Sequence, residues 1–388
     1  MDAKFSVSAP FKYIIYGMII IGVLAFVYGF YTNPAQSWAS LLLNNYYFLS
    51  LAIGASFFLA IQYISQSGWS SMFKRVPEAM ASFIPIAGII AIILLFGMKS
   101  LYHWSHSEEL AHDQLLAHKS PYLNPVFFII RLVIFFAAWI IMTRILRRFS
   151  LKEDMEGGLF YFEKSEFFSK VYIFILAFTF SFATFDWIMS IDPHWFSTIF
   201  ALKGFVASFY HGTAIVALLI LFLNDSGYFP KLNESHLLDF SRYLFMLSIV
   251  FGYLWFVEFM LVWYANIPEE TVYFVIRFNN SWKILFFLNI ILNWFVPFML
   301  LLSQKMDKNK AVLKFVCYIL IIGQWVDLYI QIMPGIIGGN PEVGFLEIGS
   351  FIGFAGLFLL VFAYTFSKAA VIPKNHPYLE ESLEHHLH

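Results

Sequence analysis

Charged residues are scarce in this 388-residue chain, and their scarcity decides the class of protein. Only 13% of the residues are charged, whereas a soluble domain carries about 25%. Hydrophobic residues make up 60% of the sequence, and Phe alone occurs 48 times. This composition excludes a water-soluble globular domain and indicates a chain built to face lipid. The net charge of −1 gives no support to nucleic acid or to any other partner recognised by bulk charge.

Cysteine is almost absent, since Cys317 is the single one and lies within an apolar run. One cysteine excludes an internal disulfide, a Cys-ligated iron–sulfur cluster and a CxxCH haem attachment. A haem held by two histidines needs two imidazoles at matched depth on facing helices, and only His211 lies deep within an apolar run. We therefore expect that the chain itself binds no metal and no redox cofactor.

Ten apolar runs are each long enough to cross a bilayer, which requires about 20 helical residues. They predict an all-α polytopic membrane protein that forms a single integral membrane domain over residues 1–388, with 367–388 as a tail. The first run is not followed by a small-residue cleavage site, so we expect it to be retained as a span. The runs cover about residues 11–31, 41–64, 79–98, 125–146, 168–190, 199–223, 240–264, 281–302, 311–332 and 347–366.

The distribution of Lys and Arg residues predicts the orientation of these spans, because cytoplasmic loops carry an excess of them. With the N-terminus inside, eighteen of the 24 Lys and Arg residues fall on the inner side and five, including Lys203 and Arg277, on the outer side. Arg131 is the remaining one and lies within a span. Both termini are therefore expected to be cytoplasmic.

Five ionisable side chains lie inside the predicted spans. Placing an ionisable group within a bilayer costs free energy, so each of them is a candidate functional residue. Four of them fall about 6–9 Å below the outer ends of their spans at a rise of about 1.5 Å per residue, and His211 lies deeper. A carboxyl near the outer surface is a suitable acceptor for a proton released there. We therefore treat all five as candidates for one proton-relay path: Arg131, Asp186, His211, Glu258 and Asp327.

Each candidate also has a structural interpretation. Arg131 and Asp186 form either an interhelical ion pair that only fixes packing or part of a proton path. His211 is either a hydrogen-bonded packing residue, which is the commoner case, or a functional group. Glu258 and Asp327 have no obvious partner at their depth, which favours a relay over protonated, hydrogen-bonded packing.

A weak internal similarity divides the spans into two groups. FDW at 185–187 and WVD at 325–327 each place an acid beside Trp near the outer end of an outward-running span. We expect two parallel four-helix bundles, about 41–190 and 199–332, plus two peripheral helices, and repeats of this kind often share a site at their interface. Chance similarity among aromatic helices is the alternative.

The predicted outer loop at about 99–124 is rich in histidine and acidic residues. His112 and Asp113 could hold a metal, but the spacing in this loop matches no strong ligand pattern. We expect a docking surface for an external partner here instead. The terminal LEHHLH resembles an affinity tag and is left out of the site reasoning.

Three stretches carry a resemblance to a known family. KSPYLNPVFFIIR at 119–131, FDWIMSIDPHWFSTIF at 185–200 and HPYLEESLEHH at 376–386, together with the ten spans, resemble the ActF-type subunits of bacterial alternative complex III. These belong to the NrfD/polysulfide-reductase-like membrane subunits. The resemblance covers essentially the whole chain, and the stretch 185–200 is its most specific part.

The resemblance implies a place in quinol oxidation at the outer side of a bacterial inner membrane. Quinol or menaquinol is then the substrate of the whole complex, and its iron–sulfur clusters and haem c are bound by partner subunits. The implied partners are an ActC-like membrane subunit, an iron–sulfur subunit, haem c subunits and lipids. In the ActC-like sister subunit a histidine on span four helps to hold quinol, whereas span four here has Arg131 and no histidine. Asp186 therefore carries over, and quinone binding by this chain itself is left open.

Two other functions fit the sequence. A proton-coupled secondary transporter fits the ten spans, the repeat and the buried acids, although the spans are unbroken in their deep interiors except at Pro85 and Pro297. A purely structural scaffold of the complex fits a chain without metal sites.

Overall fold

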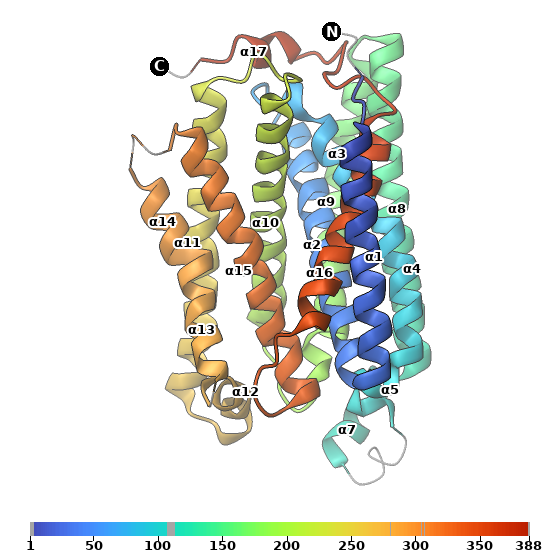
Figure 1. Cartoon of the computed structure of the whole chain (residues 1–388), viewed down its shortest axis with the longest axis vertical. Helices are drawn as coiled ribbons and strands as arrows, with labels where there is room; N and C mark the ends of the chain where they lie inside the picture. The colour runs from blue at the N-terminus through green and yellow to red at the C-terminus, as the bar shows by residue number, and fades with distance from the viewer. Residues whose placement is uncertain (1–3, 107–112, 280, 304, 306, 387–388) are drawn as a thin grey trace.

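The computed structural model of the chain is a bundle of long helices that run side by side (Figure 1). It describes residues 4–106, 113–279, 281–303, 305 and 307–386. Within these residues, ten helical crossings are long and apolar enough to span a membrane. The same described part of the chain contains no strand, and its isolated β-bridge joins Lys4 to Ala370. The all-α polytopic fold predicted from the sequence is confirmed.

Each of the ten predicted spans falls on one of these crossings. The longer helices are α1 (Ala9–Thr32), α2 (Pro34–Ile64), α8 (Pro125–Glu156), α9 (Phe160–Trp187), α10 (Thr198–Asp225), α11 (Glu234–Ala265), α15 (Lys310–Ile337) and α16 (Phe345–Phe366). One further crossing is assembled from α3 (Arg75–Ala81), α4 (Ile84–Leu94), η2 (Leu95–Gly97) and α5 (Met98–Leu101), and another from α13 (Trp282–Ile290), η5 (Ile291–Phe295) and α14 (Val296–Leu301). The α9 crossing ends with η4 (Met189–Ile191). Short helices outside the crossings are η1 (Ser71–Phe73), η3 (His103–Ser105), α7 (Gln114–Lys119), α12 (Pro268–Phe278) and α17 (Leu379–Leu383).

Helices α2 and α10 form the centre of the bundle. In the most apolar 18-residue stretch of each, 83% of the residues are buried, against 22% in α1. The backbones of α2 and α10 approach each other closely at Gly54 of α2 and Gly212 of α10. A Cβ at Gly54 would stand 1.9 Å from the Ser208 carbonyl oxygen. Small residues let two backbones approach in this way. This close contact between α2 and α10 therefore fixes α10 in the middle of the molecule.

The first and last crossings, α1 and α16, pack against each other. A Cβ added at Gly22 of α1 would stand 2.4 Å from the Cα of Gly353 in α16, and the reverse holds too. Because most of α1 faces outward, this contact holds it to the bundle. These are the two helices that the sequence analysis sets apart from the two bundles, and the division of the other spans into repeats stays a prediction.

The crossing formed by α13 and α14 is interrupted near its middle. Between them η5 adopts π-helical geometry, and Pro297 follows in the first turn of α14. A π-helical turn inserts an extra residue and changes the direction of the side chains around it, and such turns are frequent at functional sites. Asn293 lies in this turn and is fully buried.

Residues near both termini lie at one end of the bundle (Figure 1). The segment that follows α16 crosses this end and forms α17. His385 Nε2 lies 2.7 Å from Asp239 Oδ2, and Asn233 Nδ2 donates to the His385 carbonyl oxygen at 2.7 Å. The tail, as far as it is described, is therefore packed on the bundle, and His385 of the tag-like stretch contributes to this packing. Which side of the membrane this end faces stays a prediction.

Candidate functional site

Arg131 of α8 and Asp186 of α9 form a buried ion pair, which we call the outer pair. Arg131 Nε donates to Asp186 Oδ2 at 2.6 Å and Nη2 donates to Asp186 Oδ1 at 3.0 Å. The third nitrogen, Nη1, donates to the Tyr122 carbonyl oxygen at 3.1 Å, and the guanidinium carbon lies 4.0 Å from the centre of the Tyr122 ring. The pairing considered from the sequence is confirmed. A bidentate pair with its remaining donor satisfied is a stable packing element.

A small cavity of about 20 Å³ lies between α2, α4, α8 and the end of α9, and neither member of the outer pair lines it. It is lined by apolar residues together with Asn45, Tyr46, Tyr102 and Trp187. Among the described residues, neither Asn45 Oδ1 nor Trp187 Nε1 has a hydrogen-bond partner, although both atoms are buried. The volume suits one water molecule, and buried polar atoms of this kind are usually satisfied by water or ligand.

A second polar group lies between α10, α11, α13, η5 and α15, and we call it the relay group. Its members are Lys203, His211, Glu258, Asn289, Asn293 and Asp327. Lys203 Nζ lies 2.6 Å from Glu258 Oε2, and both side chains are almost fully buried. The expectation that Glu258 has no obvious partner at its depth is therefore wrong, while the assignment of Lys203 to the outer side of the membrane stays a prediction. The missed signal is that Lys203 stands in the second turn of a membrane-length helix.

A row of hydrogen bonds connects His211 to Asp327 through two amides. His211 Nε2 lies 2.8 Å from Asn293 Oδ1, Asn293 Nδ2 donates to Asn289 Oδ1 at 2.6 Å, and Asn289 Nδ2 donates to Asp327 Oδ1 at 2.7 Å. Gln331 Nε2 donates to the other Asp327 oxygen at 2.7 Å. Both oxygens of Asp327 therefore accept hydrogen bonds, an arrangement that favours a carboxylate.

The direction of this row is fixed by the backbone. Asn293 Nδ2 also donates to the Gly323 carbonyl oxygen at 2.9 Å, so its amide cannot be reversed without losing that bond. Asn293 Oδ1 consequently faces His211 as an acceptor. The other ring nitrogen, Nδ1, lies 2.6 Å from the Ala207 carbonyl oxygen, which is also an acceptor. Both bonds of the imidazole are made only when both nitrogens carry hydrogen.

The relay group is short of one positive charge. Glu258 and Asp327 are two carboxyls, whereas Lys203 is, among the described residues, the one permanent cation that acts on both. Uncompensated charge in a low-dielectric interior costs several kcal/mol. One further proton, on His211 or on a carboxyl, makes the group neutral. Glu258 Oε1 has no partner among the described residues, so that oxygen is open to a proton.

The five residues proposed from the sequence thus fall into two groups. His211, Glu258 and Asp327 belong to the relay group, while Arg131 and Asp186 form the outer pair. Tyr46 of α2 lies between them, because its hydroxyl is 2.9 Å from Thr184 Oγ1, two residues before Asp186, and is within electrostatic reach of Asp327. Within the described part of the chain, no hydrogen bond joins a member of the outer pair directly to a member of the relay group.

The turn between α9 and α10 is anchored by a second buried arginine. Arg277 of α12 donates from Nη2 to Asp192 Oδ2 at 3.1 Å and from Nε to the Ile330 carbonyl oxygen at 2.9 Å. Trp195 stacks on Tyr273 with ring centres 3.8 Å apart. Arg277, which the sequence analysis places with the outer-surface charges, is 1% exposed. These contacts tie the turn between α9 and α10 to α12 and α15.

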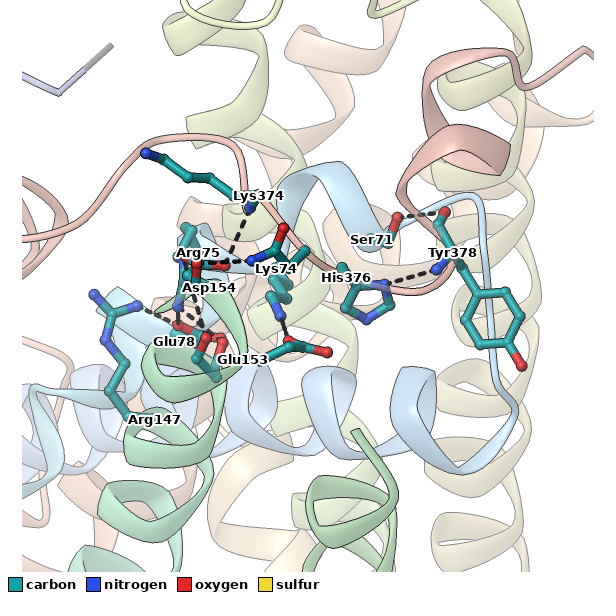
Figure 2. A network of polar contacts seen from close by, with 12 residues as sticks. Ser71, Lys74, Arg75, Glu78, Arg147, Glu153, Asp154, Lys374, His376 and Tyr378 are labelled. Carbon is teal, nitrogen blue, oxygen red and sulfur yellow. Dashed lines mark hydrogen bonds and ion pairs between the residues drawn. The ribbon is translucent and has the colours of Figure 1, made fainter. Parts of the chain in front are cut away.

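An ion cluster that the sequence analysis does not single out lies at the terminal end of the bundle (Figure 2). Its members come from the start of α3 and the end of α8: Lys74, Arg75, Glu78, Arg147, Glu153 and Asp154. The signal is the pairing of basic and acidic residues at 74–78 with those at 147–154. Three cations match three anions, so the cluster is neutral and serves packing.

The C-terminal tail covers this ion cluster (Figure 2). The Lys374 backbone N–H donates to Asp154 Oδ1 at 3.1 Å, and Ser71 Oγ donates to the Tyr378 carbonyl oxygen at 2.9 Å. Burial, together with the nearby Lys74 ammonium, lowers the pKa of His376 to about 2. His376 is therefore neutral when the tail is docked.

Asp113 of the histidine-rich loop contacts His194, which lies in the turn between α9 and α10. His194 Nε2 and Asp113 Oδ2 are 2.5 Å apart. This hydrogen bond lowers the pKa of the Asp113 carboxyl. The described residues contain no group of three or more potential metal ligands. His112, Glu108 and Glu109 lie outside the described residues, so the docking surface and the weaker metal-site interpretation stay predictions.

No protein-family model matches this chain, and no curated protein matches its sequence.

Proposed function

We propose that this chain is an integral membrane subunit of a quinol:acceptor oxidoreductase of the alternative complex III type, and that its relay group handles protons. The chain carries no redox metal in this proposal, and electrons pass through partner subunits. The resemblance at 119–131 and 185–200 supports the family assignment. Ten membrane-length crossings agree with a subunit of this kind.

One observation carries the proton-handling role, namely the row from His211 through Asn293 and Asn289 to Asp327 beside the Lys203–Glu258 pair. In this proposal His211 holds the proton that makes the group neutral. The two asparagines couple the charge of His211 to that of Asp327, since amides orient as dipoles but do not themselves ionise. If His211 loses its proton, the relay group carries a net negative charge. Proton uptake by Glu258 or Asp327 then restores neutrality and is favoured.

The two groups have different roles in this proposal. Asp186 is held by Arg131 and serves mainly to position α8 and α9 next to the cavity lined by Asn45 and Trp187. Quinol oxidation releases protons at the outer side, and an acid that is neither fully paired nor exposed is the better acceptor. Asp327 and Glu258 meet that description more closely than Asp186.

The Asp327→Asn variant tests this role in the assembled complex. We expect assembly to be retained, because Asn is isosteric, and fewer protons to be released per electron than in the wild type, because Asn cannot take up a proton. Proton-to-electron ratios in proteoliposomes provide the measurement, with Glu163→Gln at the exposed start of α9 as the control. Wild-type ratios in an assembled Asp327→Asn complex would remove the relay role.

A proton-coupled secondary transporter is the second candidate, favoured by the π-helical break at Ile291–Phe295. Broken helices at mid-membrane often bind substrate and coupling ion in transporters. Purification separates the two candidates. Co-migration with a haem c protein and an iron–sulfur protein supports the complex, whereas proton-driven solute uptake by the chain alone supports the transporter.

A further inference from the structure

A large cavity in the described part of the chain lies away from both polar groups. Its volume is about 750 Å³, within the 300–1,000 Å³ typical of ligand sites. It is enclosed by α2, α10, α15, α16 and the segment before α1, and aliphatic and aromatic side chains line almost all of it. Examples are Phe48, Leu218, Phe351 and Phe358. The cavity is lined by the Ile215–Asp225 half of α10, whereas Lys203 and His211 of the relay group lie in the other half of this helix.

The length of the cavity matches one leaflet of a bilayer. Its lining extends over Ile215–Asp225 on α10, which is about 15 Å of helix. The hydrocarbon core of a bilayer is about 30 Å thick, so one leaflet contributes about half of that length. A hydrocarbon chain lying parallel to the helices would therefore fill the cavity from the surface to mid-membrane.

One end of the cavity is polar and reaches the surface. Asp225, Ser226 and Tyr228 line this end, and the Asp225 side chain is 43% exposed. Lys310 and Lys314 of α15 both contact Asp225, and Lys314 Nζ lies 5.3 Å from the centre of the ring of Phe222, which also lines the cavity. Two ammonium groups beside one carboxylate leave a net positive charge at this end of the cavity, which we call its mouth. Both lysines are partly exposed, so they remain accessible to a second anion.

We propose that this cavity binds an anionic phospholipid, with its acyl chains among the aromatic residues and its phosphate between Lys310 and Lys314. The apolar walls, the one-leaflet length and the positive mouth each fit one part of such a molecule. A polyprenyl quinone shares the hydrocarbon tail but has no charged head, so the two lysines would add nothing to its binding. The lipid would fill the space between four crossings and stabilise their packing.

Two kinds of variant test the proposal on the full chain in mild detergent. Ala355 lines the cavity, and Ala355→Trp would occupy it, whereas Ala137→Trp adds the same side chain on an exposed surface of α8. Native mass spectrometry and lipid extraction measure the bound phospholipid. We expect wild type and Ala137→Trp to retain it and Ala355→Trp to lose it at least several-fold. The thermal melting of each variant shows whether the chain is folded, and Leu219→Phe provides a smaller filling substitution.

The mouth is tested with the double variant Lys310→Gln/Lys314→Gln and with Lys170→Gln as the control. Thermal melting is recorded after addition of phosphatidylglycerol, phosphatidylcholine or a polyprenyl quinone. We expect wild type and Lys170→Gln to be stabilised most by phosphatidylglycerol, and the double variant to lose this preference. Equal phospholipid retention in folded Ala355→Trp would overturn the proposal. So would an unchanged preference in the double variant, or a wild type that is stabilised more by the polyprenyl quinone than by phosphatidylglycerol.

Discussion

At the scale of single residues, the relay group depends on space as well as on charge. A Cβ at Gly323 would stand 2.3 Å from Asn293 Oδ1, so only glycine leaves room for the row of hydrogen bonds. The row itself was not predictable from the sequence, because the spacing of Asn289 and Asn293 puts them on one helix face but does not show that this face meets His211 and Asp327. Asp327, His211 and Glu258 could be found because ionisable residues stand out in apolar spans.

We predict that Gly323→Ala breaks the row. The added methyl group must displace Asn293, and overpacking of a tight interior costs about 1–3 kcal/mol. The thermal unfolding temperature and the proton-to-electron ratio should both be lower than in the wild type. Gly17→Ala is the matched control, because nothing lies within 4 Å of a Cβ there. Equal behaviour of the two variants would contradict the role given to Gly323.

The outer pair makes a separate prediction about stability. Removing one partner, in Arg131→Leu or Asp186→Leu, leaves a buried charge without compensation and should cost about 3–5 kcal/mol. The double variant Arg131→Leu/Asp186→Leu should recover most of this loss. Unfolding of the four proteins in a double-mutant cycle measures the coupling. Additive effects would show that the pair has no such energetic role.

At the scale of elements, close contacts between small residues decide which helices are neighbours. The glycines of α1 and α16 permit their contact, yet the sequence shows only scattered glycines and does not say which pairs face each other. The π-helical break and the packed tail are likewise tertiary features. The helices themselves could be predicted, since each is a long apolar run.

Gly353→Leu tests the contact between α1 and α16. The Gly22 backbone stands so close to Gly353 that a larger side chain must separate the two helices. We expect a disulfide engineered between α1 and α16 to form efficiently in the wild-type background and poorly in Gly353→Leu. Gly17→Leu, on an open part of α1, should leave cross-linking unchanged.

The tail makes a prediction about pH. His376 has a pKa of about 2 when docked and an ordinary value of 6.5 when released, so docking is fully favoured above pH 6.5. As the pH falls below 6.5, the released tail binds a proton that the docked tail does not, and docking weakens. Lys74, Arg75, Glu78 and Tyr63 face this histidine.

Limited proteolysis of the tail between pH 7.5 and pH 5 provides the measurement for this prediction. Cleavage should increase toward pH 5 in the wild type and change less in His376→Phe, which keeps a ring but cannot be protonated. An equal increase in both proteins would assign the effect to other groups of the ion cluster.

At the scale of the whole molecule, the ten crossings follow from composition and length alone. Their number places both termini at one end, as the structure shows. The separation of the candidates into an outer pair and a relay group could not be predicted, because depth along a span gives no information about the neighbouring helix. Lys203 was missed for the same reason, since a lysine near a span end is also typical of an exposed interface.

The central claim is that His211 and Asp327 act as one proton-binding unit through Asn293 and Asn289. Solid-state nitrogen NMR of the chain in bilayers tests it most directly, with His211→Gln used to assign the signal. The account predicts a His211 imidazolium near neutral pH in the wild type and a neutral imidazole in Asp327→Asn. A neutral His211 in the wild type, or a His211 signal unaffected by Asp327→Asn, would contradict it.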